Sequence, residues 1–441
     1  MNLVQLDRKY IWHPFTQEKN LKEPIVITKG EGAYLFDTNG KKYFDAISSW
    51  WTNIHGHAQP KIAKAIAEQA HNLEHVLFAG FSHEPAIKLA EVLVKLLNDN
   101  SDDEASKLTK VFFSDNGSTA VEVALKIAHQ YWQNKGQVRK KFISFKGAYH
   151  GDTFGAMAVG KASGFHKNFE TLLFDVDFFD FPTTWNGDSN AEAKEEKILT
   201  EIEKYIQQNK NYIAGLIIEP LVQGAGGFNM SGERFLRELV RLCKSNEVLV
   251  IFDEVMTGFG RTGDLFACKK ASALPDLICL SKGITGGFLP LACTVVREEI
   301  YEAFLGNNFD KAFAHGHSYT ANPIGCAAAL ASLELLIRNE TLEQIKMIES
   351  VHRLRLEHLA KQHEPITKPR ITGTIAAFDL NKKNGQYAGQ LSEQLKNKFL
   401  TQGFIIRPLG NVIYLMPPYC TRQEELNHVY NIIEKTIGDL K

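Results

Sequence analysis

A run of apolar residues at positions 248–252, VLVIF, most constrains the fold of this chain. The run has no polar side chain on either set of alternate positions, so a strand formed here must be covered on both faces. Ile213–Ile218 is a second such run. Strands of this kind belong to parallel sheets with helices on both sides. The sequence therefore predicts an α/β fold with a large domain built on a mainly parallel sheet.

A lysine follows a third short apolar stretch. Residues 276–280 have strand length, and Ser281, Lys282 and Gly283 then break the pattern. Open α/β sheets place their ligand crevices at the carboxyl ends of strands, where a lysine partly withdrawn from water becomes a usable nucleophile. Lys282 is thus a candidate Schiff-base lysine, although for this window alone a solvent-exposed loop lysine is the more common case.

Two acidic residues, Asp253 and Glu254, come directly after the run at 248–252. Carboxylates at the end of a buried strand are costly unless they are paired or hydrogen-bonded. We therefore expect at least one of them to meet a cation, which makes the pair a candidate for a functional site.

A glycine and a serine open a predicted helix. After a strand at 111–114, the turn at 115–119 leads into a helix that runs to about Trp132. Free backbone N–H groups and the positive end of the helix dipole favour a phosphate at such a start. Gly117 and Ser118 are therefore candidate phosphate-binding residues, although serine is also a common helix cap.

These groups together fit the chemistry of pyridoxal 5'-phosphate (PLP). This cofactor needs a lysine, a carboxylate at its pyridine nitrogen, a phosphate cradle and a flat group beside its ring. Lys282, Asp253 and the pair Gly117–Ser118 supply the first three, and Tyr149, in the loop after a strand at 142–145, supplies the fourth.

Composition argues against several other classes. Lys and Arg number 50 against 51 Asp and Glu, so the chain lacks the basic excess of proteins that bind nucleic acid. Its six cysteines show no Cys-x-x-Cys spacing, which favours reduced thiols over disulfides or a metal site. No leader and no run of membrane-spanning length is apparent. We expect a soluble cytoplasmic protein with no metal, nucleic-acid or membrane partner.

Two segments in this order, IFDEVMTGFGRTG and LSKGITGG, resemble the class III aminotransferases, which are PLP enzymes of fold type I. The resemblance extends over nearly the whole chain. More narrowly, the segments IWHPFTQ, SSWWTNIHGH, AYHGDTFGAM, HGHSYTANP and RPLGNVIYLMPPY resemble the aminotransferases of biotin synthesis, which convert 8-amino-7-oxononanoate to 7,8-diaminononanoate. The implied reaction is ping-pong, with an amino donor first and the ketone second.

The resemblance implies a role for each matching residue near the cofactor. Lys282 would form the Schiff base and move a proton, Asp253 would pair with the pyridine nitrogen, and Tyr149 would lie near the ring and the substrate. The phosphate would be held by Gly117 and Ser118, joined across a homodimer interface by His317 and Ser318.

The resemblance also implies a substrate channel, in which Arg407 would grip the carboxylate of the oxononanoate. A bidentate guanidinium suits that task. Arg261 and Asp152 would support the site. The substrate-binding residues that it implies are Phe15, Trp50, Tyr149, Lys282, Gly316 and Arg407.

The resemblance leaves two amino donors open, S-adenosylmethionine and lysine. Many members that use S-adenosylmethionine have tyrosine where this chain has Phe15, and a Pro-Thr pair where it has His317 and Ser318. Those differences resemble the members that use lysine, whereas Trp50 and Trp51 resemble the users of S-adenosylmethionine.

We expect three parts: an N-terminal segment, 1–60, that joins the small domain; a large PLP-binding domain, 61–330; and a C-terminal small domain, 331–441, with strands at 373–379 and 405–415. Two other functions remain open. Another class III activity, an ω-amino acid or diamine aminotransferase or an aminomutase, would keep Lys282 and Asp253 without needing Arg407. A non-enzymatic binding protein on the same fold would have no use for Lys282.

Overall fold

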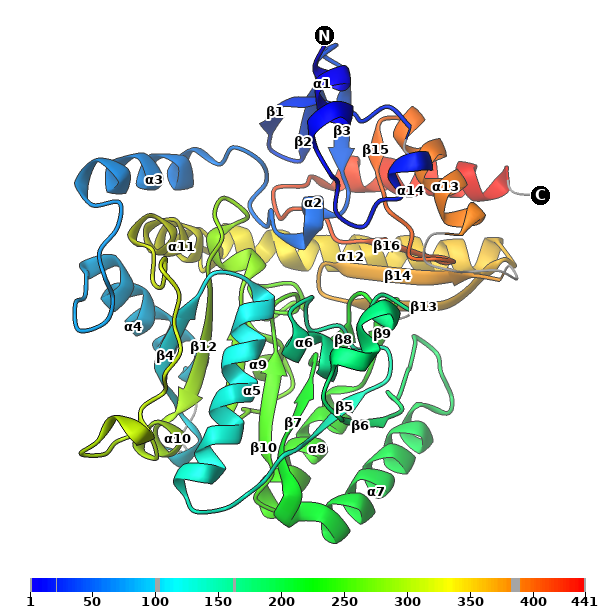
Figure 1. Cartoon of the computed structure of the whole chain (residues 1–441). Helices are drawn as coiled ribbons and strands as arrows, with labels where there is room; N and C mark the ends of the chain where they lie inside the picture. The colour runs from blue at the N-terminus through cyan, green and yellow to red at the C-terminus, as the bar shows by residue number, and fades with distance from the viewer. Residues whose placement is uncertain (1, 21, 100–103, 162–163, 382–388, 440–441) are drawn as a thin grey trace.

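A seven-stranded sheet forms the centre of the lower part of the molecule (Figure 1). The structure is a computed structural model, and it describes residues 2–20, 22–99, 104–161, 164–381 and 389–439. The strands of the sheet, from one edge to the other, are β4 (Leu108–Ser114), β12 (Ala292–Arg297), β11 (Leu277–Leu280), β10 (Leu249–Asp253), β7 (Ile213–Ile218), β5 (Lys141–Phe145) and β6 (Asp177–Phe179).

Most neighbouring strands of this sheet are parallel, which confirms the predicted fold class. β10 runs parallel to β11 and to β7, and β5 runs parallel to β7 and to β6. β12 is antiparallel to both of its neighbours, β11 and β4. The carboxyl ends of β4, β5, β7, β10 and β11 therefore meet at one edge of the sheet, where this fold class builds its sites.

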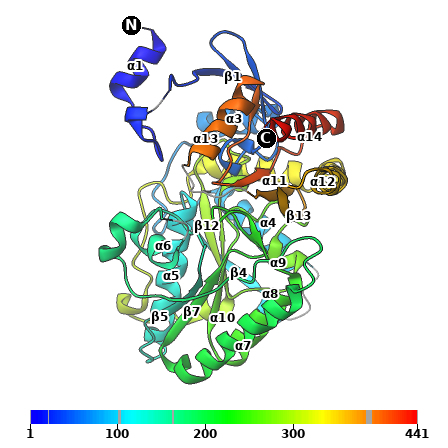
Figure 2. The same ribbon diagram turned by 90° about the vertical axis from the view of Figure 1, so that its right-hand side faces the viewer.

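Helices cover both faces of the sheet, as the apolar runs require. In β10, Leu249 and Ile251 pack into the cluster that contains the helix α5 (Gly117–Asn134), whereas Val250 and Phe252 pack with the helix α8 (Glu233–Ser245). Alternate residues of a strand point to opposite faces, so an apolar residue is needed at every position. Figure 2 shows α5 on one side of the strands and α8 on the other.

The first strands of the chain pair with a strand near its end. β1 (Ile27–Glu31), β2 (Tyr34–Asp37) and β3 (Lys42–Asp45) form the expected antiparallel sheet, and β15 (Phe404–Ile405) adds to β3 in parallel. Segments far apart in sequence thus lie side by side above the large sheet (Figure 1). The domain limits 1–60, 61–330 and 331–441 stay a prediction.

One predicted strand is wrong. Residues 405–415 form two strands, not one, because Pro408 has no N–H to donate and Gly410 adopts a φ of +63° where the chain turns. β15 joins the N-terminal sheet, whereas β16 (Val412–Leu415) pairs with β14 (Ile375–Leu380) in a second small sheet. The strand expected at 373–379 begins later than predicted, since Gly373 occupies the turn before β14.

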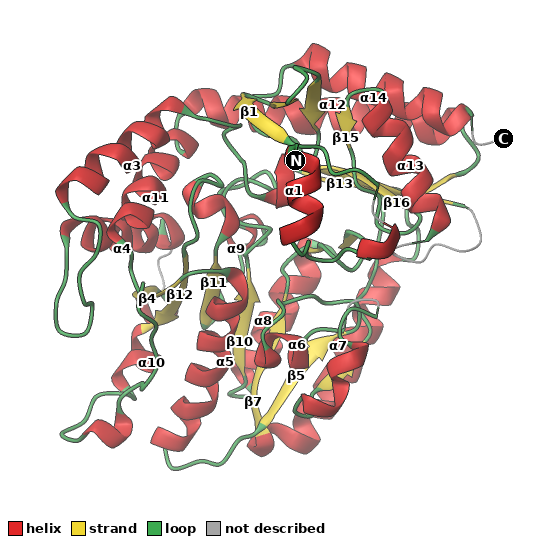
Figure 3. Cartoon of the chain, turned by 45° about the horizontal axis from the view of Figure 1, so that its top comes forward, coloured by secondary structure: helices red, strands yellow, loops and turns green. Residues whose placement is uncertain are grey.

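The other elements surround these sheets, and Figure 3 shows helices on every side of the large one. Among the described residues, no helix is long and apolar enough to cross a membrane. The remaining elements are α1 (Leu3–Tyr10), η1 (Glu18–Asn20), α2 (Ser48–Trp51), α3 (Pro60–Asn72), α4 (Glu84–Asn98), η2 (Glu104–Ser106), α6 (Phe154–Val159), η3 (Lys167–Leu172), α7 (Ala191–Asn209), η4 (Lys210–Tyr212), β8 (Val222–Gln223), β9 (Asn229–Met230), α9 (Ala267–Lys270), η5 (Lys282–Thr285), α10 (Glu298–Glu302), η6 (Phe309–Lys311), α11 (Pro323–Leu336), α12 (Asn339–Gln362), β13 (Ile366–Thr372), α13 (Gln390–Thr401) and α14 (Gln423–Gly438).

Candidate active site

A cavity of about 490 Å³ lies at the carboxyl edge of the large sheet. Four strands lead to its walls: β11 to Lys282, β10 to Asp253, β4 to Gly117 and β5 to Tyr149. All five residues predicted to bind the cofactor from within one chain line this cavity: Gly117, Ser118, Tyr149, Asp253 and Lys282. The shared direction of the strands explains why residues so far apart in sequence meet here.

Lys282 is half-buried at the start of η5, and it has a φ of +46°. A lysine rarely adopts this left-handed conformation, and such strain is common at functional sites. Burial lowers the pKa of the Lys282 amine, while the nearby Asp253 and Glu219 carboxyl groups act in the opposite direction. A lowered pKa leaves more of the amine neutral, which is the form that attacks a carbonyl and accepts a proton.

Asp253 is only 4% exposed, and the surrounding groups fix its carboxylate in place. The imidazole of His150 lies with Nδ1 2.7 Å from Oδ2, and the backbone N–H of Val255 donates to Oδ1 at 3.1 Å. His150 is itself buried, so the expected cation beside Asp253 is replaced by an imidazole and by the more distant Lys282. A carboxylate held in this way is available to a further donor in the cavity.

The start of α5 is shaped for an anion. Gly117 is its first residue, and a Cβ added there would lie 2.7 Å from a methyl carbon of Val255, so only glycine fits. Ser118 is exposed to the same cavity, and its Oγ accepts a hydrogen bond from the backbone N–H of Asp152 at 3.1 Å. Backbone N–H groups at a helix start are the standard donors to a phosphate.

The residues around this cavity fit PLP. The amine of Lys282, the buried carboxylate of Asp253 and a glycine-serine helix start face a single space, and each is the group that one part of the cofactor requires. Within the described residues, no group of three or more His, Cys, Asp and Glu side chains is placed to hold a metal ion.

A second cavity, of about 320 Å³, adjoins the first and shares Trp51, Tyr149 and Lys282 with it. The Arg407 guanidinium lies 5.0 Å from the centre of the Trp50 ring, and the Phe15 ring lies 5.8 Å from the same ring. The predicted substrate residues that line this cavity are Phe15, Trp50, Tyr149, Lys282 and Arg407. The structure therefore places the predicted carboxylate-binding arginine and the predicted reactive lysine in one space.

Three predicted residues lie elsewhere. Gly316, His317 and Ser318 belong to the segment between η6 and α11, and within the described part of the chain none of them lines either cavity. The backbone N–H of His317 donates to the Thr320 hydroxyl at 3.1 Å. Their predicted contact with the cofactor or the substrate thus requires a second subunit, and it stays a prediction.

Two further groups in the cavity, Glu219 and Trp51, have no role predicted from the sequence. Glu219, at the end of β7, accepts hydrogen bonds from the backbone N–H groups of Tyr149 at 3.0 Å and Gly224 at 2.9 Å. Burial raises the pKa of Glu219 to about 7. Trp51 lines both cavities, and its ring centre lies 4.8 Å from Lys282 Nζ. The rule that singled out Asp253, an acid directly after a buried strand, identifies Glu219 as well.

Comparisons with known proteins agree with this site. The aminotransferase class III family matches residues 15–437. The chain is 51% identical to an adenosylmethionine-8-amino-7-oxononanoate aminotransferase from Synechococcus elongatus, over 98% of this chain and 99% of that one. A protein of the same name from Geobacter sulfurreducens is 40% identical, over 98% and 96% of the two chains.

Solved structures give the same picture. The crystal structure of an adenosylmethionine-8-amino-7-oxononanoate aminotransferase from Methanocaldococcus jannaschii has a TM-score of 0.90 and 37% identity, covering 99% of this chain and 98% of that chain. An amine transaminase from an uncultivated Pseudomonas species, in its PLP-bound form, has a TM-score of 0.91 and 29% identity, covering 98% and 99% of the two chains.

Proposed function

The chain belongs to the class III aminotransferase family, and from this premise we propose that it transfers an amino group to 8-amino-7-oxononanoate, giving 7,8-diaminononanoate in biotin biosynthesis. It is a PLP-dependent aminotransferase. The names of its relatives support the proposed substrate. One observation of the structure carries the proposal further: Arg407 and Lys282 line a single cavity.

The substrate has a carboxylate and a ketone at opposite ends of an alkyl chain. The second cavity offers Arg407 for the carboxylate, Lys282 for the reacting end, and the side chains of Ile47, Leu409 and Ala225 along its apolar wall. A guanidinium binds a carboxylate through two parallel hydrogen bonds, which also orients the chain. A class III enzyme of another substrate class would need no long-chain pocket that ends in Arg407.

The residues of the first cavity have distinct tasks. When bound, PLP supplies the carbonyl that receives the amino group and a ring that takes up the electron pair of the broken C–H bond. Asp253 would hold a proton on the ring nitrogen, and Gly117 with Ser118 would bind the phosphate. Lys282 would accept a proton at Nζ from the donor carbon and deliver it again, a task that its lowered pKa supports.

Trp51 and Tyr149 would border the reacting groups. The Tyr149 hydroxyl donates to Asp152 at 2.8 Å, which fixes its ring at the boundary of the two cavities. Buried aromatic rings exclude water from the space between them, and exclusion of water strengthens the electrostatic contacts there.

The donor is S-adenosylmethionine or lysine. The names of the relatives support S-adenosylmethionine, and so do the aromatic rings of Phe15, Trp50 and Phe165 at the second cavity, because a flat base stacks on such rings. The absence of a hydroxyl on Phe15 supports lysine as the donor. Phe15 lies 5.7 Å from Phe165, ring centre to ring centre.

We propose also that the enzyme is a cytoplasmic homodimer with shared active sites. Exposed aromatic side chains on two neighbouring segments, Phe309 and Tyr319, flank Gly316, His317 and Ser318 and favour a covered surface there. All six cysteines are free thiols, which suits a reducing compartment.

The test uses the visible absorbance of the purified holoenzyme. S-adenosylmethionine and lysine are added separately, and the yellow absorbance is expected to fall with the true donor and to return when 8-amino-7-oxononanoate is added. Lys282→Ala is expected to lose both the yellow colour and turnover, whereas Lys269→Ala, a change at a lysine outside the site, keeps both. Loss of colour with simple ω-amines, and no return with the oxononanoate, would assign a different class III substrate.

A further inference from the structure

The turn that carries the two tryptophans is strained. Within α2, Ser48, Ser49 and Trp51 have φ values of 52°, 57° and 67°. Side chains other than glycine rarely occupy this left-handed region, and here three of four consecutive residues do so. Such a conformation persists only where the surrounding structure holds it, and it is concentrated at functional sites.

The buried carboxylate of Asp45 accepts hydrogen bonds from the backbone of this turn. Asp45 ends β3, has no exposed surface, and accepts hydrogen bonds from the backbone N–H of Ile47 at 3.3 Å and of Ser49 at 2.6 Å. Its Oδ2 also accepts from the Ser49 hydroxyl at 3.1 Å and from Nε2 of His57 at 2.9 Å. The carboxylate thus accepts two hydrogen bonds from Ser49, and His57 fixes the carboxylate.

The strand that ends in Asp45 pairs with the strand that leads to Arg407. β3 pairs in parallel with β15, in the register Asp45 to Ile405, and the Ala46 N–H donates to the Ile405 carbonyl at 3.2 Å. Arg407 follows two residues later. The Trp50 ring, carried by the strained turn, lies 5.0 Å from its guanidinium.

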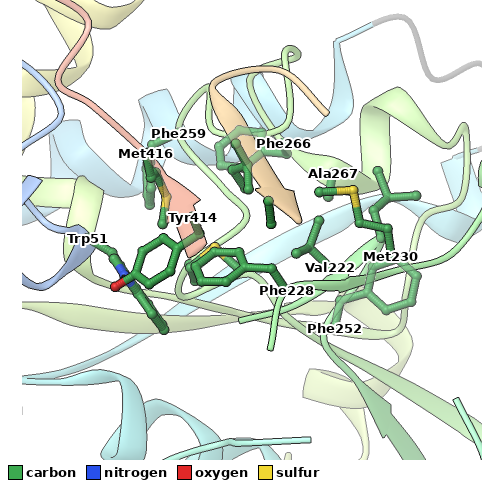
Figure 4. Packing of buried hydrophobic residues seen from close by; sticks show 14 of the residues in the cluster. Trp51, Val222, Phe228, Met230, Phe252, Phe259, Phe266, Ala267, Tyr414 and Met416 are labelled. Atoms are coloured by element: carbon green, nitrogen blue, oxygen red, sulfur yellow. The ribbon is translucent and has the colours of Figure 1, made fainter. Parts of the chain in front are cut away.

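The second tryptophan of the turn is also fixed. Nε1 of Trp51 donates to the Tyr414 hydroxyl at 3.1 Å, and Figure 4 shows the indole nitrogen pointing toward that hydroxyl. Because Trp51 is held through its own ring, release of Asp45 is expected to displace Trp50 more than Trp51.

We propose that Asp45, together with His57, is a positioning residue for the substrate-carboxylate pocket. Asp45 lines neither cavity; it acts through Ser49, whose conformation sets the Trp50 ring against Arg407. This inference rests on the proposed function only for the identity of the acceptor. That the carboxylate holds the strained turn is a property of the protein without substrate.

The decisive variant is Asp45→Asn. An amide has one acceptor oxygen and one NH₂ group, so in either orientation at least one of the N–H groups around Asp45 loses its acceptor. The matched control is Asp276→Asn: Asp276 is 1% exposed, accepts from the Val250 N–H at 2.7 Å, and precedes β11 at the end of the sheet opposite Lys282.

The first readout is hydrogen exchange of holoenzymes without substrate. We expect the peptide covering 45–57 to lose protection in Asp45→Asn and to keep it in Asp276→Asn. Unchanged exchange of this peptide in Asp45→Asn would overturn the proposal. Should Asp45→Asn not fold, His57→Ala removes one donor from the carboxylate and is read in the same way, with a smaller loss expected.

The second readout is the kinetics of Asp45→Asn, Arg407→Ala and the double variant. If Asp45 acts through the placement of Trp50 against Arg407, Asp45→Asn raises the KM for 8-amino-7-oxononanoate about 10- to 100-fold with a smaller change in kcat. It then adds little to Arg407→Ala in the double variant. Full additivity of the two KM effects would overturn the proposal. A wild-type enzyme that does not use this acceptor would refute the proposed function instead, and hydrogen exchange would still decide the role of Asp45.

Discussion

At the residue scale, burial sets the protonation of the groups that face each other across the first cavity. Burial lowers the pKa of the Lys282 amine and raises that of the Glu219 carboxyl to about 7. Each change favours the neutral form, because a charge withdrawn from water is costly. The Glu219 carboxyl is therefore able to gain or lose a proton near neutral pH, and the Lys282 amine gives up its proton more readily than a lysine in water, which favours proton transfer at Lys282.

Arg407 gives the most direct test of the substrate. Arg407→Ala is expected to weaken binding of 8-amino-7-oxononanoate by roughly 2 to 5 kcal/mol, since it removes one partner of a buried charge pair. Arg407→Lys keeps the charge but loses the bidentate geometry, so we expect an intermediate effect. The measurement is the KM for the acceptor beside the rate of the donor half-reaction. Equal KM values in all three proteins would point to a substrate without a carboxylate.

The sequence identified the residues whose chemistry is rare in their context. Lys282 and Asp253 follow apolar runs at strand ends, and the position alone predicts a site. His150 and Trp51 were harder to predict from the sequence, because each matters through a contact with a residue far away in the chain. The 2.7 Å approach of His150 to Asp253 joins the loop after β5 to the end of β10, two strands that are separated by β7, and no local pattern indicates it.

At the element scale, the end of β10 is joined to a short helix. Both carboxylate oxygens of Glu254 accept backbone N–H groups at the start of α9, from Ala267 and from Cys268, each at 2.7 Å. Burial raises the pKa of Glu254 to about 7 despite these donors. Glu254 thus holds the loop that follows Asp253, and the free-energy cost of keeping its buried carboxyl ionised depends on pH.

This cost gives a prediction for stability. The Glu254 carboxyl ionises near pH 4.5 in the unfolded chain and near pH 7 in the folded protein, so the folded protein binds more protons between these values. The free energy of unfolding therefore falls as the pH rises from about 4.5 to 7, by roughly 3 kcal/mol from this one group. Glu254→Gln cannot ionise and should lack that part of the decrease.

Urea unfolding of wild type and Glu254→Gln at pH 5 and pH 8, at one protein concentration, measures the difference. The free energy of unfolding of Glu254→Gln, compared with that of wild type, should be higher at pH 8 than at pH 5. The exposed residue Glu340 provides a control, since Glu340→Gln should follow the wild type at both pH values. A Glu254→Gln protein that also follows the wild type would show that burial of this acid has no energetic effect.

Elements with regular apolar patterns were predicted well, and irregular ones were not. The strand β10 follows from an unbroken apolar run and the helix α5 from apolar residues that repeat every three or four positions, because both elements pack against a core. The division of 405–415 into β15 and β16 depends on a turn at Gly410 and on pairing with two different sheets. The strained turn of α2 depends on Asp45 and has no glycine to mark it.

At the scale of the whole molecule, the predicted cofactor residues divide into two groups. Gly117, Asp253 and Lys282 line one cavity, whereas His317 and Ser318 line neither cavity of the described chain. If the proposed homodimer has shared sites, the second group reaches the cofactor of the partner. A two-fold axis then makes both sites equivalent, each with residues from both subunits.

Subunit mixing tests this arrangement. His317→Asp places a negative charge where the phosphate is expected, and Lys282→Ala removes the reactive amine, so each homodimer should be nearly inactive. A heterodimer of the two, isolated with two affinity tags, has one site with an intact Lys282 and an intact His317, and about half of the wild-type activity should return. The matched control pairs Lys282→Ala with Asp253→Ala, two residues of the same cavity, and should recover nothing. Absence of recovery in the first pair would place His317 outside the partner's site, whereas recovery in both pairs would indicate contamination with wild-type enzyme. Recovery in the first pair alone follows only if the phosphate site is completed across the interface.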